Sequence, residues 1–547
     1  MLNCDYKIVD YILSGRLMPV LCRLIHPSQS AYLRSRHGIL LPATVQAAID
    51  YVHDSNSPAV FFNADSEKAF DRVEWEWLLR VLKAYGFHDA FIPMLFTCLR
   101  GQTLYCSVNG HLSRPFRRTR GFTQGSMLAD LLFILSQEPL LAALRSPKVN
   151  SGVAMPSGPP LRVMAFADDT TSACSTAADI CLVLHTFKVF GRASGARLNF
   201  SKSFFVPVGS LINVVVVPNT GCRWIVDCDN GDPAPSFTLC GIPLTTRPAR
   251  LDPARHLAAF VEDIVASILT TLARWSQFHA PPEARAALVN SRLLSKLWHV
   301  AEVVPISTAA VASIEKASLN FVYADVTFRP SRPAAHAPRK LGGLGLINVA
   351  AKVTAFKSRW IARFADFHSS PRPRPPPPWC ALAGHAFAQL PSGLSQMLSP
   401  SVPFNLTMLP RQSLWREVFL AWRSIQGGRL SPPSSVWDLA LEPVSHNCLL
   451  LPESSSAASS CLRRHGYRSV TDVWDSGRSA WHLRYHPVAG PLSARLHACW
   501  DSLLRNAASP IPVPTPGDHV AAWYWGPCAG LLSRFPVFFL WVYYYAA

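Results

Sequence analysis

Two adjacent aspartates lie between two strand-forming runs of the sequence. Asp168 and Asp169 lie between the apolar residues 163–166 and the threonines at 170–171, a pattern that predicts a β-hairpin with carboxylates in its turn. Adjacent carboxylates repel each other, and a divalent cation would relieve that repulsion. A solvated Asp-Asp turn explains the pair better when it is taken alone, so a metal site requires a further carboxylate nearby.

Asp65 supplies that partner, because it ends a second apolar run at residues 59–65. Neighbouring strands of one sheet would bring Asp65 beside Asp168 and Asp169. Three carboxylates placed there would hold two Mg²⁺ ions, the arrangement that stabilises both the attacking and the leaving oxygen in phosphoryl transfer. Alternatively, Asp65 is an ordinary carboxylate at a helix N-terminus, favoured there by the helix dipole.

The charge balance indicates a polyanionic partner. The 547 residues include 52 Lys plus Arg against 34 Asp plus Glu, a formal net charge of +18, which favours nucleic acid. A 49% apolar composition excludes wholesale disorder. None of the 14 cysteines has the spacing of a zinc site, and the first ten residues lack the apolar core of a signal peptide. We therefore expect an intracellular protein with free thiols that is not secreted.

Two stretches interrupt the folded pattern. Residues 369–378 (SSPRPRPPPP) predict a polyproline-type spacer, and residues 454–460 (SSSAASS) a second flexible stretch. The only membrane-like stretch, residues 530–547, contains Arg534 and Pro536 and falls short of the roughly 20 apolar residues of a spanning helix. We expect no stable membrane association, although a membrane-surface protein is a third interpretation of the basic charge.

Several motifs occur in the order seen in one enzyme family. They are A-D-S-E-K-A-F-D-R-V-E-W at residues 64–75, R-G-F-T-Q-G-S at 120–126 and F-A-D-D-T at 166–170. Shorter matches include L-I-H-P-S-Q-S at 24–30, S-G-A-R-L-N-F-S-K-S at 194–203 and L-C-G-I-P-L at 239–244. Over residues 1–365 the chain resembles reverse transcriptases of the LINE type, the polymerases of non-LTR retrotransposons.

The resemblance implies an α+β right-hand polymerase with fingers, a palm bearing an antiparallel sheet, and a helical thumb. We expect reverse transcriptase fingers and palm at residues 1–245 and a thumb-like helical region at 246–365. A Pro-rich linker at 366–380 and a mostly helical or irregular C-terminal region of unknown function at 381–547 would follow. The family's upstream endonuclease domain is missing, so the chain is interpreted as a piece of an element's second open reading frame.

The resemblance also implies individual roles. Asp65, Asp168 and Asp169 would bind two Mg²⁺ ions, and Lys202 would protonate or stabilise the leaving pyrophosphate. Phe70 would exclude ribose sterically, while Gln124 and Gly125 would orient template and nucleotide. Arg34 or Arg36 would approach the triphosphate. The implied partners are an RNA template, a DNA primer and a dNTP.

Two basic segments extend this prediction to nucleic-acid contacts. Arg117, Arg118 and Arg120 precede Gln124 and suit phosphates, although a solvated basic loop explains them as well. From Pro282 onward, helical spacing places Arg285, Arg292 and Lys296 on one face, while Val289, Leu293 and Leu297 recur on an apolar side. That face would follow a phosphate backbone, or it is simply solvated surface charge.

The predicted function is therefore an RNA-directed DNA polymerase acting in the nucleus at the site of integration. One departure favours an alternative: residues 126–130 read S-M-L-A-D where the family has a P-L-S-P sequence. The alternative is a truncated, degenerate relic that binds nucleic acid without efficient polymerisation. The oligomeric state, the template and the source of the nicking endonuclease are not encoded in any motif.

Overall fold

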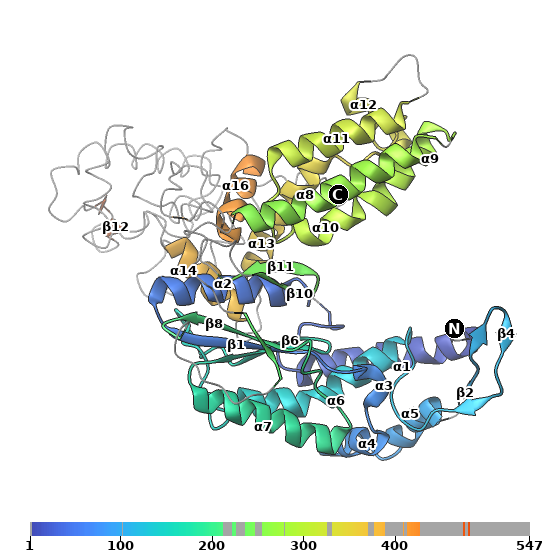
Figure 1. The fold of residues 1–547 in the computed structure, drawn as a ribbon, viewed down its shortest axis with the longest axis vertical. Coiled ribbons are helices and arrows are strands. Elements are labelled where there is room, and N and C mark those ends of the chain that lie inside the picture. The colour runs from blue at the N-terminus through green and yellow to red at the C-terminus, as the bar shows by residue number, and fades with distance from the viewer. Residues whose placement is uncertain are drawn as a thin grey trace. The chain divides into compact units, whose positions relative to one another are not determined.

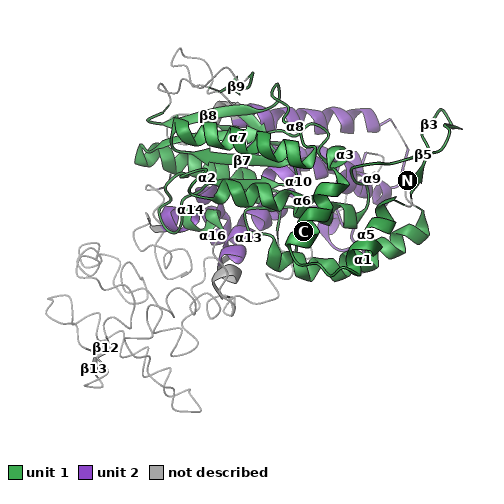
Figure 2. Ribbon diagram, turned by 90° about the horizontal axis from the view of Figure 1, so that it is seen from below, with its two compact units in different colours: residues 1–252, 377–382 green, residues 253–376, 383–547 purple. Residues whose placement is uncertain are grey.

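The structure is a computed structural model, which describes part of the 547-residue chain. The described residues are 3–34, 36–100, 102–211, 221–225, 236–246, 254–277, 279–324, 331–369, 377–388, 409, 413–426, 474–475 and 480–481. The predicted flexible stretch at 454–460 and the membrane-like stretch at 530–547 lie outside them. The chain divides into two compact units, residues 1–252 with 377–382 and residues 253–376 with 383–547 (Figure 2).

Unit 1 combines helices with a β-sheet, which confirms the α+β class. Its helices are α1 (Cys4–Leu24), α2 (Leu40–Ser55), α3 (Ala69–Arg72), α4 (Trp75–Ala84), α5 (Phe91–Arg100), α6 (Met127–Arg145) and α7 (Ala177–Ser194). Its strands are β1 (Pro58–Ala64), β2 (Thr103–Leu104), β3 (Ser107–Val108), β4 (His111–Leu112), β5 (Phe116–Arg117), β6 (Val163–Phe166), β7 (Asp169–Cys174), β8 (Phe204–Gly209), β9 (Arg223–Trp224), β10 (Ser236–Leu239) and β11 (Ile242–Thr245).

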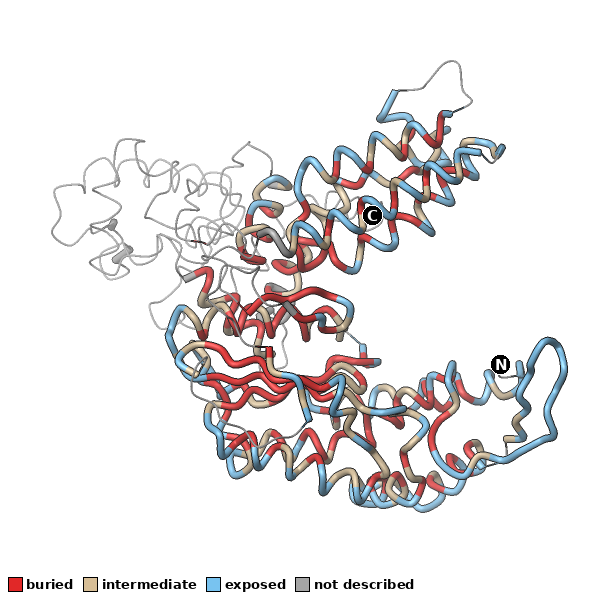
Figure 3. Tube along the Cα trace, in the orientation of Figure 1, coloured by how far each residue is buried: buried red, intermediate tan, exposed pale blue. Residues whose placement is uncertain are grey.

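The central sheet has the strand order β6-β7-β1-β8-β9, and all its pairings are antiparallel except β8 with β9. Apart from Pro58, β1 is buried (Figure 3). Helices α6 and α7 cover one face of the sheet and α2 lies on the other (Figure 1). On the first face Phe62 of β1 packs in one cluster with Leu141 of α6 and Val183 of α7. Because β1 is buried and both faces of the sheet are covered, the last residue of β1 has a fixed position.

Two local sequence patterns agree with the structure. Asn109-Gly110 favours a tight hairpin turn, and it joins β3 to β4 with positive φ at both residues, 50° and 85°. Val73, Trp77, Val81 and Tyr85, at a spacing of four, predict an amphipathic helix, and α4 covers most of this segment.

Helix α6 corrects the prediction about membrane-like segments. Among the described residues it is the one helix whose length and apolar composition would allow it to cross a membrane. Most of its side chains, including Phe133 and Leu141, are nevertheless buried inside unit 1. Its composition therefore reflects its place in the protein core.

Unit 2 is mainly helical in its described part. Its elements are α8 (Ala254–Trp275), α9 (Pro282–Leu288), a π-helix (Val289–Leu293), α10 (Ser295–Ala301), α11 (Thr308–Val322), α12 (Arg332–His336), a 3-10 helix (Arg339–Leu341), α13 (Val349–Ser369) and α16 (Leu414–Gln426), with short strands β12 (Trp474–Asp475) and β13 (Ala480–Trp481). Helix α14 (Pro378–Ala388) includes residues of both units. Trp360 of α13 packs edge-on against Trp415 of α16.

Candidate active site

The pairing of β1 with β7 brings the predicted carboxylates together. Ala64, the last residue of β1, is paired with Thr170 in the antiparallel register. Asp65 therefore follows β1 at the level of Asp169, the first residue of β7, because antiparallel partners run in opposite directions. Asp168 precedes Asp169 in the hairpin turn. Segments about a hundred residues apart in the sequence thus place three aspartates at one end of the sheet.

The three carboxylates also interact electrostatically. Burial raises the pKa of Asp168, and the charge of Asp65 raises it further, while a backbone hydrogen bond lowers it. Burial raises the pKa of Asp169 too, with the charges of Asp168 and Asp65 adding to the effect. Within the described ranges, no three His, Cys, Asp or Glu side chains are gathered closely enough to form a ready-made metal cage. The aspartates form a repelling group whose repulsion a cation would relieve.

The turn that carries Asp168 has a constrained backbone. Phe166 pairs with Asp169, which leaves Ala167 and Asp168 as a two-residue turn between β6 and β7. Ala167 has a φ of 54°, in the left-handed region that non-glycine residues rarely adopt. The buried Gln29 holds this residue on both sides: its Nε2 donates to the Ala167 carbonyl at 3.2 Å, and its Oε1 accepts from the Ala167 N–H at 3.0 Å. Gln29 therefore fixes the conformation of the turn that carries Asp168.

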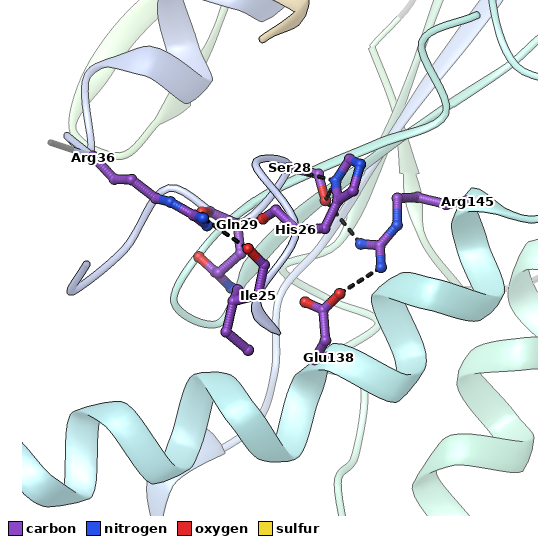
Figure 4. A network of polar contacts seen from close by, with 7 residues as sticks. All are labelled: Ile25, His26, Ser28, Gln29, Arg36, Glu138 and Arg145. Carbon is purple, nitrogen blue, oxygen red and sulfur yellow. Dashed lines mark hydrogen bonds and ion pairs between the residues drawn. The ribbon is translucent and has the colours of Figure 1, made fainter. Parts of the chain in front are cut away.

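Arg36 in turn fixes the segment that contains Gln29. Its guanidinium donates to the carbonyls of Ile25 at 2.7 Å, His26 at 2.8 Å and Gln29 at 2.6 Å (Figure 4). These bonds occupy a side chain that the sequence assigned to the triphosphate. Arg34, the alternative in that prediction, is exposed. The structure thus gives Arg36 a supporting role, and the contact of either arginine with a triphosphate stays a prediction.

A polar network braces the same segment from α6. Arg145 donates to Glu138 at 2.5 Å and to the Ser28 hydroxyl at 2.9 Å, and that hydroxyl lies 3.1 Å from Nδ1 of His26 (Figure 4). Burial and the positive charges of Arg145 and Arg36 lower the pKa of His26 to about 4. The imidazole is therefore neutral at physiological pH, as a ring beside two guanidinium groups must be.

Asp65 is held through its backbone. Its N–H donates to the hydroxyl of the buried Ser203 at 3.1 Å, and its carbonyl accepts from the N–H of Asn199 at 2.9 Å. Lys202 lies in this loop and is exposed. Lys202, the lysine predicted to act on the pyrophosphate, therefore lies three residues after Asn199 and next to Ser203, the two residues that hold the Asp65 backbone.

A cysteine contacts the site from a separate hairpin. Cys240 occupies the turn between β10 and β11 with a φ of 49°. Its thiol donates to Oδ2 of Asp169 at 3.5 Å, and burial raises the pKa of that thiol. Cys240 is therefore a neutral donor to one of the three carboxylates, and the L-C-G-I-P-L motif marks its position in the sequence.

Phe70 is fixed by stacking and by its backbone. Its ring stacks on that of the buried Phe133, with centroids 4.1 Å apart and planes 16° apart. Its carbonyl accepts from the N–H of Phe122 at 2.9 Å, which joins α3 to the loop that contains Gln124 and Gly125. The predicted sugar gate and the predicted template motif therefore belong to one connected piece of the protein.

Gln124 and Gly125 are exposed on that loop. Gly125 has a φ of 84°, and a Cβ added there would meet no atom within 4 Å, so the backbone conformation alone requires glycine. Behind the loop, Oδ2 of Asp10 accepts from the Met127 N–H at 3.0 Å, and Oδ1 accepts from the Ser126 hydroxyl. Asp10 thus attaches α1 to the N-terminus of α6, where a negative charge is favourable.

Asp130 should make the protein less stable at neutral pH than in mild acid. Burial, and secondly the charge of Asp10, raise the pKa of Asp130 from 3.8 to about 6. The folded protein therefore binds a proton that the unfolded chain lacks between these two values, so stability falls as pH rises through that window. We expect Asp130→Asn to raise the free energy of unfolding at pH 7 by about 1 kcal/mol, less than the full shift because the side chain is half exposed. Urea denaturation at pH 4 and pH 7 checks this, and a variant without the pH 7 gain would contradict it.

The basic residues before Gln124 differ in their surroundings. Arg117 is exposed on β5. Arg118 donates to the hydroxyl of Thr123 at 3.3 Å, and Arg120 forms an exposed ion pair with Glu74 at 3.2 Å. An exposed pair of this kind is weak, on the order of 0–1 kcal/mol, so it leaves Arg120 available to a phosphate.

In unit 2 the predicted basic face is wrong at Arg285. This side chain is 1% exposed, donates to the Phe321 carbonyl at 3.0 Å and lies over the Phe321 ring. Arg292 and Lys296 are exposed, as predicted, and Val289, Leu293 and Leu297 are buried. Arg285 therefore belongs to the apolar side of its helix and cannot contact a phosphate.

The π-helix explains the error. Buried residues recur at every fourth position, namely Arg285, Val289, Leu293, Leu297 and Ala301. In a straight α-helix each such step would rotate the stripe by about 40°. The π turn, closed by the Leu294 N–H donating to the Val289 carbonyl at 3.0 Å, accommodates an extra residue and keeps the stripe on the core. The prediction assumed a regular α-helix and therefore placed Arg285 on the basic face instead of the buried one.

Salt dependence should separate the two arginines. If Arg292 neutralises a phosphate, Arg292→Ala should reduce the slope of log affinity against log salt for an RNA–DNA hybrid by about 1. Arg285→Met should leave that slope unchanged and lower the free energy of unfolding by about 2 kcal/mol, because it removes the charged hydrogen bond to the Phe321 carbonyl and the contact with the Phe321 ring. Fluorescence anisotropy across a salt series measures the slopes. A reduced slope in the Arg285 variant would contradict the assignment.

Comparison with known proteins agrees with this geometry. Residues 1–225 match the family described as reverse transcriptase (RNA-dependent DNA polymerase). The chain is 27% identical over 457 residues to the Transposon TX1 uncharacterized 149 kDa protein of Xenopus laevis, covering 82% of this chain and 33% of that protein. It is 24% identical over 334 residues to the Pol polyprotein of the type-2 retrotransposable element R2DM of Drosophila melanogaster, covering 58% and 28%. The chain thus spans about a third of the length of these relatives.

Among solved structures, apo telomerase from Candida tropicalis is similar at 11% identity with a TM-score of 0.33, covering 58% of this chain and 50% of that one. This likeness is too slight to bear on the fold. The family match contains all three aspartates, and the two relatives above come from a transposon and a retrotransposable element. The resemblance to LINE-type reverse transcriptases is therefore confirmed, with residues 1–225 as the part of the chain that matches the reverse transcriptase family.

Proposed function

We propose that the chain is an RNA-directed DNA polymerase that extends a DNA primer on an RNA template. The observation that carries the proposal is the β1–β7 register, which sets Asp65 beside Asp168 and Asp169. The family match over residues 1–225 and the retrotransposon polyproteins support the same chemistry. The primer 3′-hydroxyl would attack the α-phosphate of the dNTP, and pyrophosphate would leave.

The three aspartates fit a pair of Mg²⁺ ions. Carboxylate oxygens are the ligands that Mg²⁺ prefers. At Asp168 and Asp169, burial and the repulsion between neighbouring carboxylates raise the pKa. When bound, the ions would stabilise the attacking and leaving oxygens. The chain's own side chains do the rest: Phe70 excludes the ribose hydroxyl, and the ammonium of Lys202 donates a proton to the pyrophosphate or stabilises its charge.

The finer parts of the fold follow from this proposal. Residues 1–245 would supply fingers and palm, with the central sheet as the palm, and residues 246–365 a helical thumb. Of the predicted linker at 366–380, the Pro-rich part between α13 and α14 would join these helices, and 381–547 would be a region of unknown function. Gln124 and Gly125 would orient template and nucleotide, while Arg34, Arg117, Arg118 and Arg120 would contact phosphates. Synthesis would take place in the nucleus at the site of integration.

A primer-extension assay tests the proposal. The protein, a DNA primer annealed to an RNA template, Mg²⁺ and dNTPs should give a DNA product that chelation with EDTA abolishes. Tight binding of the hybrid with no extension over a range of Mg²⁺ concentrations would contradict it and would support the nucleic-acid-binding relic instead. Hybrid binding by fluorescence anisotropy, measured on the same preparation, separates these outcomes.

A further inference from the structure

Tyr32 has a backbone conformation that is unusual for a bulky residue. Its φ is 58°, and the N–H of Leu33 donates across it to the carbonyl of Ala31 at 2.8 Å. These features describe a γ-turn with positive φ, a strained form. Such strain costs on the order of 1–3 kcal/mol and persists only where the surroundings impose it, typically at functional sites.

The γ-turn at Tyr32 and the turn that carries Asp168 are held by the same side chain, that of Gln29. Oε1 of Gln29 accepts from the N–H of Ala31 at 3.1 Å and from the N–H of Ala167 at 3.0 Å. One buried oxygen therefore fixes both the segment that leads into Tyr32 and the turn that carries Asp168. Gln29 therefore links the position of Tyr32 to that of the turn that carries Asp168.

The ring of Tyr32 contacts the predicted sugar gate. Its centroid lies 6.4 Å from that of Phe70, with the planes nearly perpendicular at 84°, and 6.3 Å from that of Phe166. Phe70 thus has a stacking partner in Phe133 and an edge-on partner in Tyr32, an arrangement worth about 0.5–1.5 kcal/mol per pair. Tyr32 is still 37% exposed, so part of its ring remains accessible to a ligand.

The hydroxyl of Tyr32 remains protonated near these acids. Burial, and then the charges of Asp130 and Asp168, raise the pKa of Tyr32 to about 12. The side chain therefore brings no negative charge to a site that must accept a triphosphate. Its contribution is the shape of the ring.

We propose that Tyr32 is a specificity-determining residue that forms, with Phe70, the wall against the 2′ position of the incoming nucleotide. Tyr32 holds the Phe70 ring at the depth where a deoxyribose fits and a ribose hydroxyl does not. The inference rests on the proposed polymerase function. It adds a second residue, from a distant segment of the chain, to the discrimination between dNTPs and rNTPs.

Single-nucleotide incorporation kinetics test this inference. The quantity measured is kcat/KM for a dNTP divided by kcat/KM for the matching rNTP. Tyr32→Ala should lower this ratio about tenfold or more, since loss of contact with a bulky group in a pocket changes discrimination by about 10–200-fold. Tyr32→Phe keeps the ring and should retain the wild-type ratio within about twofold. Tyr11→Ala, which removes a tyrosine 73% exposed on α1, is the matched control.

Tyr32→Asn guards against a folding defect, because asparagine tolerates positive φ better than alanine does. It removes the ring and should lower the ratio as Tyr32→Ala does. If both variants incorporate dNTPs with an unchanged ratio, the inference is wrong. If the wild-type protein incorporates no dNTP at all, the proposed function is wrong and the inference falls with it.

Discussion

Replacing Asp168 with asparagine is expected to lower kcat for primer extension about 1,000-fold or more. The amide keeps the size of the side chain and removes the charge that would hold a cation, and metal-ion stabilisation is worth several kcal/mol in the transition state. The fold should persist, because burial opposes the charged form of Asp168 and the neutral amide removes that cost. Single-turnover extension of a primer on an RNA template measures the effect.

Asp89→Asn is the matched control for this variant. Asp89 is an exposed aspartate of unit 1 between α4 and α5, and its substitution should leave kcat unchanged. Hybrid binding by the Asp168 variant should stay within about twofold of wild type, because the arginines proposed to contact phosphates lie elsewhere. Full activity of Asp168→Asn would exclude the carboxylates as the catalytic group.

Gln29→Leu should impair both stability and synthesis. The leucine has a similar volume and none of the three bonds that Gln29 makes to Ala31 and Ala167. Buried polar groups left without partners cost about 1–3 kcal/mol each, so we expect the free energy of unfolding to fall by about 3 kcal/mol. The turn with Asp168 would lose its fixed conformation, and kcat of the folded fraction should fall about 100-fold, as small misplacements of catalytic groups do.

Gln46→Leu provides the comparison. Gln46 makes the same kind of paired contact to the backbone of Thr245, accepting from its N–H at 2.9 Å and donating to its carbonyl at 3.3 Å. Thr245 lies at the end of β11 remote from the Cys240 turn. Loss of this contact should destabilise unit 1 by a similar amount and leave kcat of the folded fraction near wild type. Equal losses of kcat in the two variants would show that the effect of Gln29 is general destabilisation.

The sequence predicted those parts of the site that depend on local patterns. Asp65 and Asp168 follow apolar strand runs, and pairing of those strands was enough to anticipate their meeting. The Asn109-Gly110 hairpin was predicted because only a few residues favour two successive positive φ angles. The metal-binding and substrate-binding roles of these residues stay predictions.

The rest depends on contacts that no local pattern encodes. Gln29 bonds to a turn in which Ala167 has a positive φ, and Tyr32 itself has a positive φ in a γ-turn. Neither alanine nor tyrosine favours this backbone conformation. Arg36 was one of two arginines that the family resemblance assigned to the triphosphate, and its bonds to the carbonyls of residues 25–29 become visible only in the folded loop. The motif L-I-H-P-S-Q-S was the one available signal for Gln29, and it carried no indication of which residue mattered.

The attachment of α1 to α6 through Asp10 has a practical meaning for anyone dividing this chain into smaller pieces. A fragment that starts after the tenth residue would still contain every acidic, aromatic and amide group proposed to act on substrate. It would lack the carboxylate that accepts from Ser126 and Met127, so the loop of Gln124 and Gly125 would lose its anchor. The shortest useful fragment must therefore include Asp10, which caps the N-terminus of α6, in addition to the groups proposed to act on substrate.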